Sequence, residues 1–192
     1  MTEHPLDLVR SRELLDGPRP RRLLTELNSD RYSKHLVVFR PNEKAVDDLV
    51  EKARAAIPGL TDTSVVHRVL RHNPDCMIAI ARKRKFNPDV PFGDGFFAFL
   101  PLNKMGLYQL ATNTLDTRNP DLSLITRPDE TPAGIYVWAT YAPGPIAAGV
   151  ALVMEKVEVP PYAGVTLYSR PNTPEGFRFN ENLGWKRGAK IG

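Results

Sequence analysis

The residues best suited to chemistry lie around a turn that follows the apolar run 135–141. A Pro-Gly-Pro turn (143–145) interrupts that run, and the small residues Ala147, Ala148 and Gly149 come next. The first N–H groups of a helix have no intrahelical acceptor, and small side chains let a ligand approach the backbone closely. The pattern therefore predicts that a phosphorylated ligand binds where a helix begins in this segment.

Other residues with reactive side chains favour ordinary roles. His67 and His72 are five positions apart on one expected helix, so they do not share a face as a metal-binding pair would. Cys76 is the only cysteine, which excludes a disulfide within the chain, and it is more typical of a buried small residue than of a nucleophile. No Cys or His cluster has zinc-site spacing, so the sequence predicts no metal.

The composition is that of a folded globular protein. The chain is 42% apolar and 25% charged, which excludes disorder, collagen and a disulfide scaffold, and its length of 192 residues favours one domain. The formal charge is +4, and basic residues gather at 19–22 and 82–85. Such runs could bind phosphate or nucleic acid, but short runs at strand ends are more typical of a solvated surface. With no membrane span and no signal pattern, we expect a cytoplasmic location and leave a homodimer open.

The elements that must position the turn begin after a polar N-terminal stretch. Residues 1–34 are polar and punctuated by Pro5, Pro18 and Pro20, and we expect them to form an N-terminal extension with short helices at 7–15 and 23–27. A single domain should follow over residues 35–192.

Periodicity within this domain predicts a mixture of strands and helices. Strands are expected at 35–39, 76–81, 95–100, 135–141 and 164–169, and an edge strand or tail closes the chain. Helices are expected after the cap Asn42, after 61–63, over 102–112 and 145–157, and after the cap Thr173.

Two of these segments carry further expectations. In the strand 135–141, alternation should place Ile135, Val137, Ala139 and Tyr141 on one face. The segment 113–132 is rich in Asp, Asn, Thr and Pro, which is typical of a long surface connection. Long connections of this kind often bind substrate, and we expect substrate selection to depend on it.

The order of these elements resembles the GNAT superfamily of acyl-CoA-dependent N-acyltransferases. The final helix strengthens the resemblance, because in the family it commonly ends in Leu-Gly-Phe, and this chain has Leu183-Gly184-Trp185 in register. The resemblance covers about residues 35–190 by element order. It implies an α/β (α+β) fold in which a mixed, mostly antiparallel central sheet is flanked by helices and has splayed central strands.

The resemblance implies acetyl-CoA or another acyl-CoA as co-substrate. In the family, the strand before the turn pairs with the pantetheine arm, and the N–H groups of the turn receive the pyrophosphate. The family's turn usually has an arginine where this chain has Ile146. The cofactor-binding residues implied here are Tyr141, Ala142, Ile146, Ala147, Ala148, Gly149, Val150 and Thr173.

The implied reaction requires a base for the attacking amine and an acid for the departing thiolate. The family often uses a tyrosine as that acid, and this chain has Asn180 at the corresponding position. Tyr141 and Tyr168 are the substitutes, because each is expected at a strand end beside the slot and a phenol can donate a proton to a thiolate.

Three classes of function remain open. The leading one is an N-acyltransferase that acts on a small-molecule or protein amine. Ile146 and Asn180 favour instead a GNAT-like binding or regulatory protein without catalysis. The third is a nucleic-acid-binding module that uses the two basic runs, although no motif of a groove-reading helix accompanies them. None of the three involves a membrane.

Overall fold

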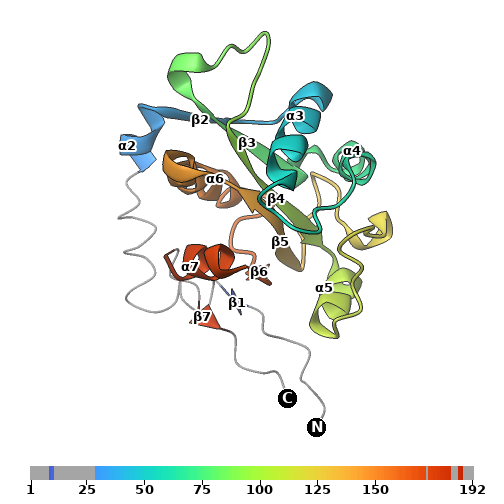
Figure 1. The fold of residues 1–192 in the computed structure, drawn as a ribbon. Helices are drawn as coiled ribbons and strands as arrows, with labels where there is room; N and C mark the ends of the chain where they lie inside the picture. Colours follow the sequence, from blue (N-terminus) through green and yellow to red (C-terminus); the bar gives the residue numbers. More distant parts are fainter. Residues whose placement is uncertain (1–8, 11–28, 172, 183–185, 188–192) are drawn as a thin grey trace.

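A mixed sheet forms the centre of the protein. The computed structural model describes residues 9–10, 29–171, 173–182 and 186–187, and within them seven strands lie in the order β2-β3-β4-β5-β6-β1-β7 (Figure 1). The strands are β1 (Val9–Arg10), β2 (Leu36–Phe39), β3 (Met77–Arg82), β4 (Gly95–Leu102), β5 (Gly134–Tyr141), β6 (Leu167–Ser169) and β7 (Lys186–Arg187). Only the β5–β6 pair is parallel, so the expected mostly antiparallel α+β fold is confirmed.

Helices flank both faces of the sheet. They are α2 (Ser29–Ser33), α3 (Glu43–Arg54), α4 (Thr63–His72), α5 (Lys104–Ala111), α6 (Val150–Val157) and α7 (Pro174–Asn182). The expected cap is present at α3, where the Asn42 side chain accepts the Ala45 N–H at 2.9 Å. No helix in the described part of the chain has the length and apolar character needed to cross a bilayer.

Two hydrophobic layers hold the helices to the sheet. On one face, Phe97 and Phe99 of β4 pack with Val153 of α6. On the opposite face, the same strand packs against α3, α4 and α5, through residues such as Leu49 and Leu110. β4 is therefore buried on both faces. Each such side chain that leaves water contributes about 1.5–3 kcal/mol to the stability of the fold, so this strand anchors it.

A β-bulge interrupts the central ladder. Ala98 pairs with Ala139, whereas the next residue, Phe99, pairs with Val137, so Trp138 is an extra residue in β5. A bulge of this kind reverses which face the following side chains occupy. The strand therefore changes its alternation within the part that borders the site.

The bulge corrects one expectation about β5. Ile135 and Val137 pack on the α6 face, while Ala139 and Tyr141 pack on the α3 face. The prediction that all four share one face is wrong, because the residue inserted at Trp138 shifts the two-residue period.

The central strands separate beyond a short paired region. β5 and β6 pair only between residues 135–137 and 167–169. β6 ends at Ser169, whereas β5 continues to Tyr141, so residues 138–141 have no described strand on that side. The expected splay is therefore present, and it leaves part of one β5 edge unpaired.

The N-terminal segment is joined to the fold at two places. β1 pairs with both β6 and β7, and Tyr32 of α2 packs against the core beneath α6. Residues 9–10 of the helix expected at 7–15 are a strand, and the rest of it lies outside the described residues. The helix expected at 23–27 also lies outside them.

The expected helix 145–157 divides into two parts. Residues Gly144–Gly149 form a 3₁₀ helix, η5, and α6 begins only at Val150. A 3₁₀ turn closes hydrogen bonds between residues three apart, which matters for the ligand site expected at this turn.

Candidate functional site

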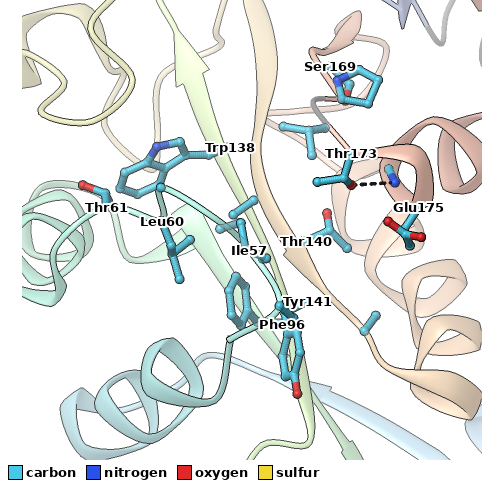
Figure 2. Close-up of a pocket in the computed structure, with 18 of the residues that line it drawn as sticks. Ile57, Leu60, Thr61, Phe96, Trp138, Thr140, Tyr141, Ser169, Thr173 and Glu175 are labelled. Atoms are coloured by element: carbon cyan, nitrogen blue, oxygen red, sulfur yellow. Dashed lines mark hydrogen bonds between the residues drawn. The ribbon is translucent and has the colours of Figure 1, made fainter. Parts of the chain in front are cut away.

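A cavity of about 790 Å³ lies where β5 and β6 separate. It extends from the α3–α4 connection, residues 55–62, across the end of β5 to the start of α7 (Figure 2). Its volume is within the range of ligand-binding pockets. The cavity therefore joins elements that are far apart in the sequence.

One end of the cavity, here named the apolar arm, is lined by Ile57, Leu60, Phe96, Trp138 and Tyr141. These side chains come from the α3–α4 connection, β4 and β5, and Figure 2 shows them grouped together. The rings of Phe96 and Tyr141 are 6.2 Å apart and tilted by 44°. An arm of this kind favours an apolar or ring-bearing group over a charged one.

The other end, here named the polar end, is lined by Thr140, Ser169, Thr173, Glu175 and Asn180. Asn180 donates from Nδ2 to Ser169 Oγ at 3.1 Å, and both residues are buried. Thr173 caps α7, because its Oγ1 accepts the Gly176 N–H at 3.0 Å (Figure 2). The polar end is thus built mainly from hydroxyl and amide groups.

Thr140 differs from its neighbours at the polar end. Its Oγ1 is buried and has no hydrogen-bond partner among the described residues. Burying an unpaired hydroxyl costs about 1–3 kcal/mol, and such groups in native proteins need an explanation. A ligand that accepts from or donates to this hydroxyl would remove the cost.

Three arginines border the cavity and have different surroundings. Arg170 donates to the Leu110 carbonyl at 2.5 Å, and burial lowers the pKa of Arg170 while the nearby Tyr136 opposes the shift. Arg178 forms an exposed ion pair of 2.8 Å with Glu175. Arg118 also lines the cavity, and its guanidinium lies beside Gly59 of the α3–α4 connection. Arg170 thus has a structural contact to α5, and Arg118 is the cation on the α3–α4 side.

The structure separates the two tyrosines expected to be catalytic. Tyr141 lines the apolar arm, and Tyr168 does not line the cavity. Tyr168 instead packs over Gly134, where an added Cβ would lie 2.9 Å from Tyr168 Cε2, and beside Leu107. The parallel register places Tyr168 opposite Tyr136, which directs both side chains to the α5 face. The two expected tyrosines are therefore not brought together.

The expected cofactor residues divide into two groups. Tyr141, Ala142 and Thr173 line the cavity. The others, in η5 and at the start of α6, do not; they are Ile146, Ala147, Ala148, Gly149 and Val150. The wall of the cavity at this turn is formed by Pro143 and Gly144 instead.

The turn itself faces the core. Ile146 is buried, and a Cβ added at Gly149 would lie only 2.3 Å from Ile80 Cγ2. The Ile146 N–H donates to the Pro143 carbonyl at 3.2 Å, and the Val150 N–H donates within the same turn. The 3₁₀ geometry thus consumes donors that a regular helix start would offer to an anion.

The sequence analysis missed several residues that line the site. Trp138 lies on the same face as Tyr136, beside the α3–α4 connection, and Thr140 and Ser169 border the splay. Neither bulge nor register leaves a signal in one sequence. The turn at Pro58 and Gly59 was visible, but nothing in the sequence placed it beside β5.

The long connection 113–132 reaches the site, as its expected role in substrate selection requires. Trp138 donates from Nε1 to the Thr117 carbonyl at 2.7 Å, and the Thr61 hydroxyl donates to the Arg118 carbonyl. Arg68 of α4 also donates to Asn119 Oδ1 at 2.6 Å. These bonds fix the connection against the apolar arm.

The remaining candidates have ordinary surroundings. His67 contacts Asp47 at 2.6 Å, and His72 contacts the Ile125 carbonyl at 2.8 Å. Cys76 is fully buried, and burial raises the pKa of its thiol. In the basic run, Arg82 pairs with Asp94 at 3.1 Å. Among the described residues, no group of His, Cys, Asp or Glu could hold a metal ion.

Comparisons with known proteins found no match to this chain, whether to a family model, to a curated protein or to a solved structure.

Proposed function

We propose that the protein transfers an acyl group from acetyl-CoA or another acyl-CoA to an amine, as an N-acyltransferase of GNAT type. The observation that carries the proposal is the unpaired edge of β5 at residues 138–141, which lies along a cavity of ligand size. An extended ligand with amide groups can hydrogen-bond to a free strand edge much as another strand would. The pantetheine arm of coenzyme A has this chemistry.

The residues at the splay fit such a ligand better than the turn does. Thr140 supplies a hydroxyl without a described partner, and Ala142 and Gly144 form a wall with little side-chain bulk. Residues 146–150 of η5 and α6 do not line the cavity. The proposal therefore assigns the pantetheine arm to β5 and assigns no phosphate contact to residues 146–150.

The chemistry of the proposed reaction is direct acyl transfer. Acyl-CoA supplies an activated thioester; the amine nitrogen forms a bond to the acyl carbon, the carbon–sulfur bond breaks, and coenzyme A leaves as the thiol. The proton lost by the amine must reach solvent or a base, and the departing sulfur must gain one. Tyr141, which lines the cavity, is the proposed donor to sulfur. Tyr168 is left out because it packs toward α5.

Calorimetric titration with acetyl-CoA and with coenzyme A tests the donor site. We expect saturable binding by the wild-type protein and weaker binding by Thr140→Val, which keeps the side-chain shape and removes the hydroxyl. Lys83→Gln, on the exposed β3–β4 connection, is the control and should bind as the wild type does. If the wild-type protein binds neither acetyl-CoA nor coenzyme A, the proposal is contradicted.

Turnover is tested separately, with a panel of amines and a reagent that detects the released thiol. The buried thiol of Cys76 should contribute little background in the folded protein. Acylated amine identified by mass spectrometry, together with stoichiometric thiol release, is the expected result. The proposal includes the cytoplasmic location that the sequence favours.

A second candidate function is ligand binding without catalysis. Asn180 favours it, because this residue is buried and hydrogen-bonded to Ser169 at the position where the resembled family often has its acid. Coenzyme A binding with no thiol release from any amine in the panel would support this candidate over the enzyme.

A further inference from the structure

We infer that the apolar arm binds the amine acceptor and selects one whose nitrogen and carboxylate lie at opposite ends of a ring-sized apolar group. The inference rests on the proposed acyl transfer, since it assigns the acceptor of that reaction. The cavity continues from the splay into the arm, so an acceptor in the arm would have one end at the unpaired edge of β5.

The wall of the arm is made mainly of aliphatic side chains and aromatic rings. The Trp138 N–H donates to the Thr117 carbonyl at 2.7 Å, which leaves the indole ring as a contact surface. Phe96 and Tyr141 form a tilted ring pair, and Leu60 lies opposite Trp138 in Figure 2. Such a wall stabilises a flat apolar group by removing it from water and by ring contacts.

A cation borders the arm beside the α3–α4 connection. Among the described residues that line the cavity on this side, Arg118 is the charged one. Its guanidinium lies over Gly59, where an added Cβ would be 3.3 Å from Nη2. The described residues place no carboxylate in an ion pair with it. A planar guanidinium binds a carboxylate through two parallel hydrogen bonds, so this end suits an anionic group.

The backbone around Arg118 is held on both sides. The Trp138 N–H donates to the carbonyl of Thr117, which precedes Arg118, and the Thr61 hydroxyl donates to the carbonyl of Arg118. Recognition at Arg118 is therefore fixed relative to the ring that contacts the ligand. We assign the amine end of the acceptor to the side of the cavity that Thr140 and Ser169 line, where the proposed thioester would be attacked.

The arrangement also excludes competing amines. A linear diamine carries a second ammonium group, for which the apolar arm offers no carboxylate and which Arg118 repels. An amine with a ring but no carboxylate fills the arm and loses the contact at Arg118. The arm should thus rank these three kinds of amine in a definite order.

The experiment uses the fluorescence of Trp138 in a Trp185→Phe background, without any acyl donor. The probes are para-aminomethylbenzoate, benzylamine and putrescine. We expect saturable quenching by the first, binding about tenfold weaker by the second, and no saturation with the third. Arg118→Gln should abolish the difference between the two ring amines, because it removes the guanidinium and leaves the apolar wall.

Matched variants guard against loss of folding. Leu60→Glu should abolish binding of both ring amines, whereas Leu60→Met and Lys85→Gln should retain it. Equal binding of the two ring amines by the wild type, or saturable binding of putrescine, would overturn the inference. If the protein binds the ring amines but not coenzyme A, only the proposed acyl transfer is rejected. If it binds coenzyme A but not the ring amines, only this inference is rejected.

Discussion

Thr140 and Asn180 lie in the same cavity and differ in how their polar atoms are satisfied. Asn180 bonds to Ser169, and the Thr140 hydroxyl has no partner among the described residues. A satisfied buried pair contributes to stability, whereas an unpaired buried hydroxyl lowers it. The chain thus retains one group at this site that folding alone does not favour.

Thr140→Val should separate stability from ligand binding. Because valine has nearly the same shape and buries no hydroxyl, we expect the free energy of unfolding to rise by about 1 kcal/mol. Coenzyme A binding should weaken about tenfold if the hydroxyl contacts the ligand. Urea unfolding and calorimetry measure the two quantities. A variant that is less stable and binds normally would mean that Thr140 has a purely structural role.

Cys76 should make stability depend on alkaline pH. Burial raises the pKa of its thiol, with a smaller contribution from Asp75. Above about pH 8.5 the unfolded thiol releases a proton that the folded thiol retains. The stabilisation that is present below this pH is therefore lost as pH rises. The free energy of unfolding falls by up to about 1.4 kcal/mol per pH unit.

Urea unfolding between about pH 8.5 and 9.5 measures this effect below the ordinary tyrosine pKa of about 10. Cys76→Ala should show a shallower loss of stability than the wild type over this interval. Parallel pH profiles for the two proteins would show that the thiol does not ionise on unfolding in this range.

At the level of elements, the bulge in β5 and the 3₁₀ turn η5 decide what the site can bind. The bulge brings Tyr141 to the α3–α4 side, where Trp138 already lies, and so extends the apolar arm there. The 3₁₀ turn directs Ile146 and Gly149 into the core. The first irregularity places Tyr141 in the wall of the cavity, and the second packs part of the expected cofactor turn against the core.

Gly149→Ala and Gly144→Ala should act in different ways. The new methyl group at Gly149 would meet Ile80 at 2.3 Å, and we expect a loss of about 1–3 kcal/mol from overpacking. Gly144 has no neighbour within 4 Å of its Cβ position and a φ of +55°, so alanine there should cost about 1 kcal/mol through the backbone alone.

Urea unfolding of both variants, followed by coenzyme A titration of the folded proteins, provides the test. Gly144 lines the cavity and Gly149 does not, so only the first substitution should alter binding. A binding defect confined to Gly149→Ala would restore η5 as the cofactor turn.

At the scale of the whole molecule, the domain begins before residue 35. β1 inserts between β6 and β7, and α2 packs beside α6. The polar end of the cavity lies next to β6, whose outer edge pairs with β1. The N-terminal segment therefore contributes to the sheet that holds the site.

Tyr32→Ala tests this contribution of α2. Tyr32 is half-buried against the α6-side core, and we expect its truncation to lower the free energy of unfolding by about 1–3 kcal/mol. Tyr108, which is 62% exposed on α5, is the matched control, and Tyr108→Ala should change stability by less than about 0.5 kcal/mol. Equal effects in urea unfolding would mean that α2 is an independent extension.

The sequence by itself determined the element order, the principal strands and the helix caps. These depend on contacts between residues close in the chain, such as the Asn42 cap of α3 and the Thr173 cap of α7. The mostly antiparallel sheet and its splay could also be predicted, through the resemblance in element order.

Only the tertiary structure decided which side chains meet in the site. The bulge at Trp138 depends on the pairing of β5 with β4, and the position of Arg118 depends on bonds to Trp138 and Thr61 across the fold. The 3₁₀ form of η5 accompanies the packing of Gly149 against Ile80. Register and packing join residues that are distant in the chain, and local propensity carries no information about such pairs.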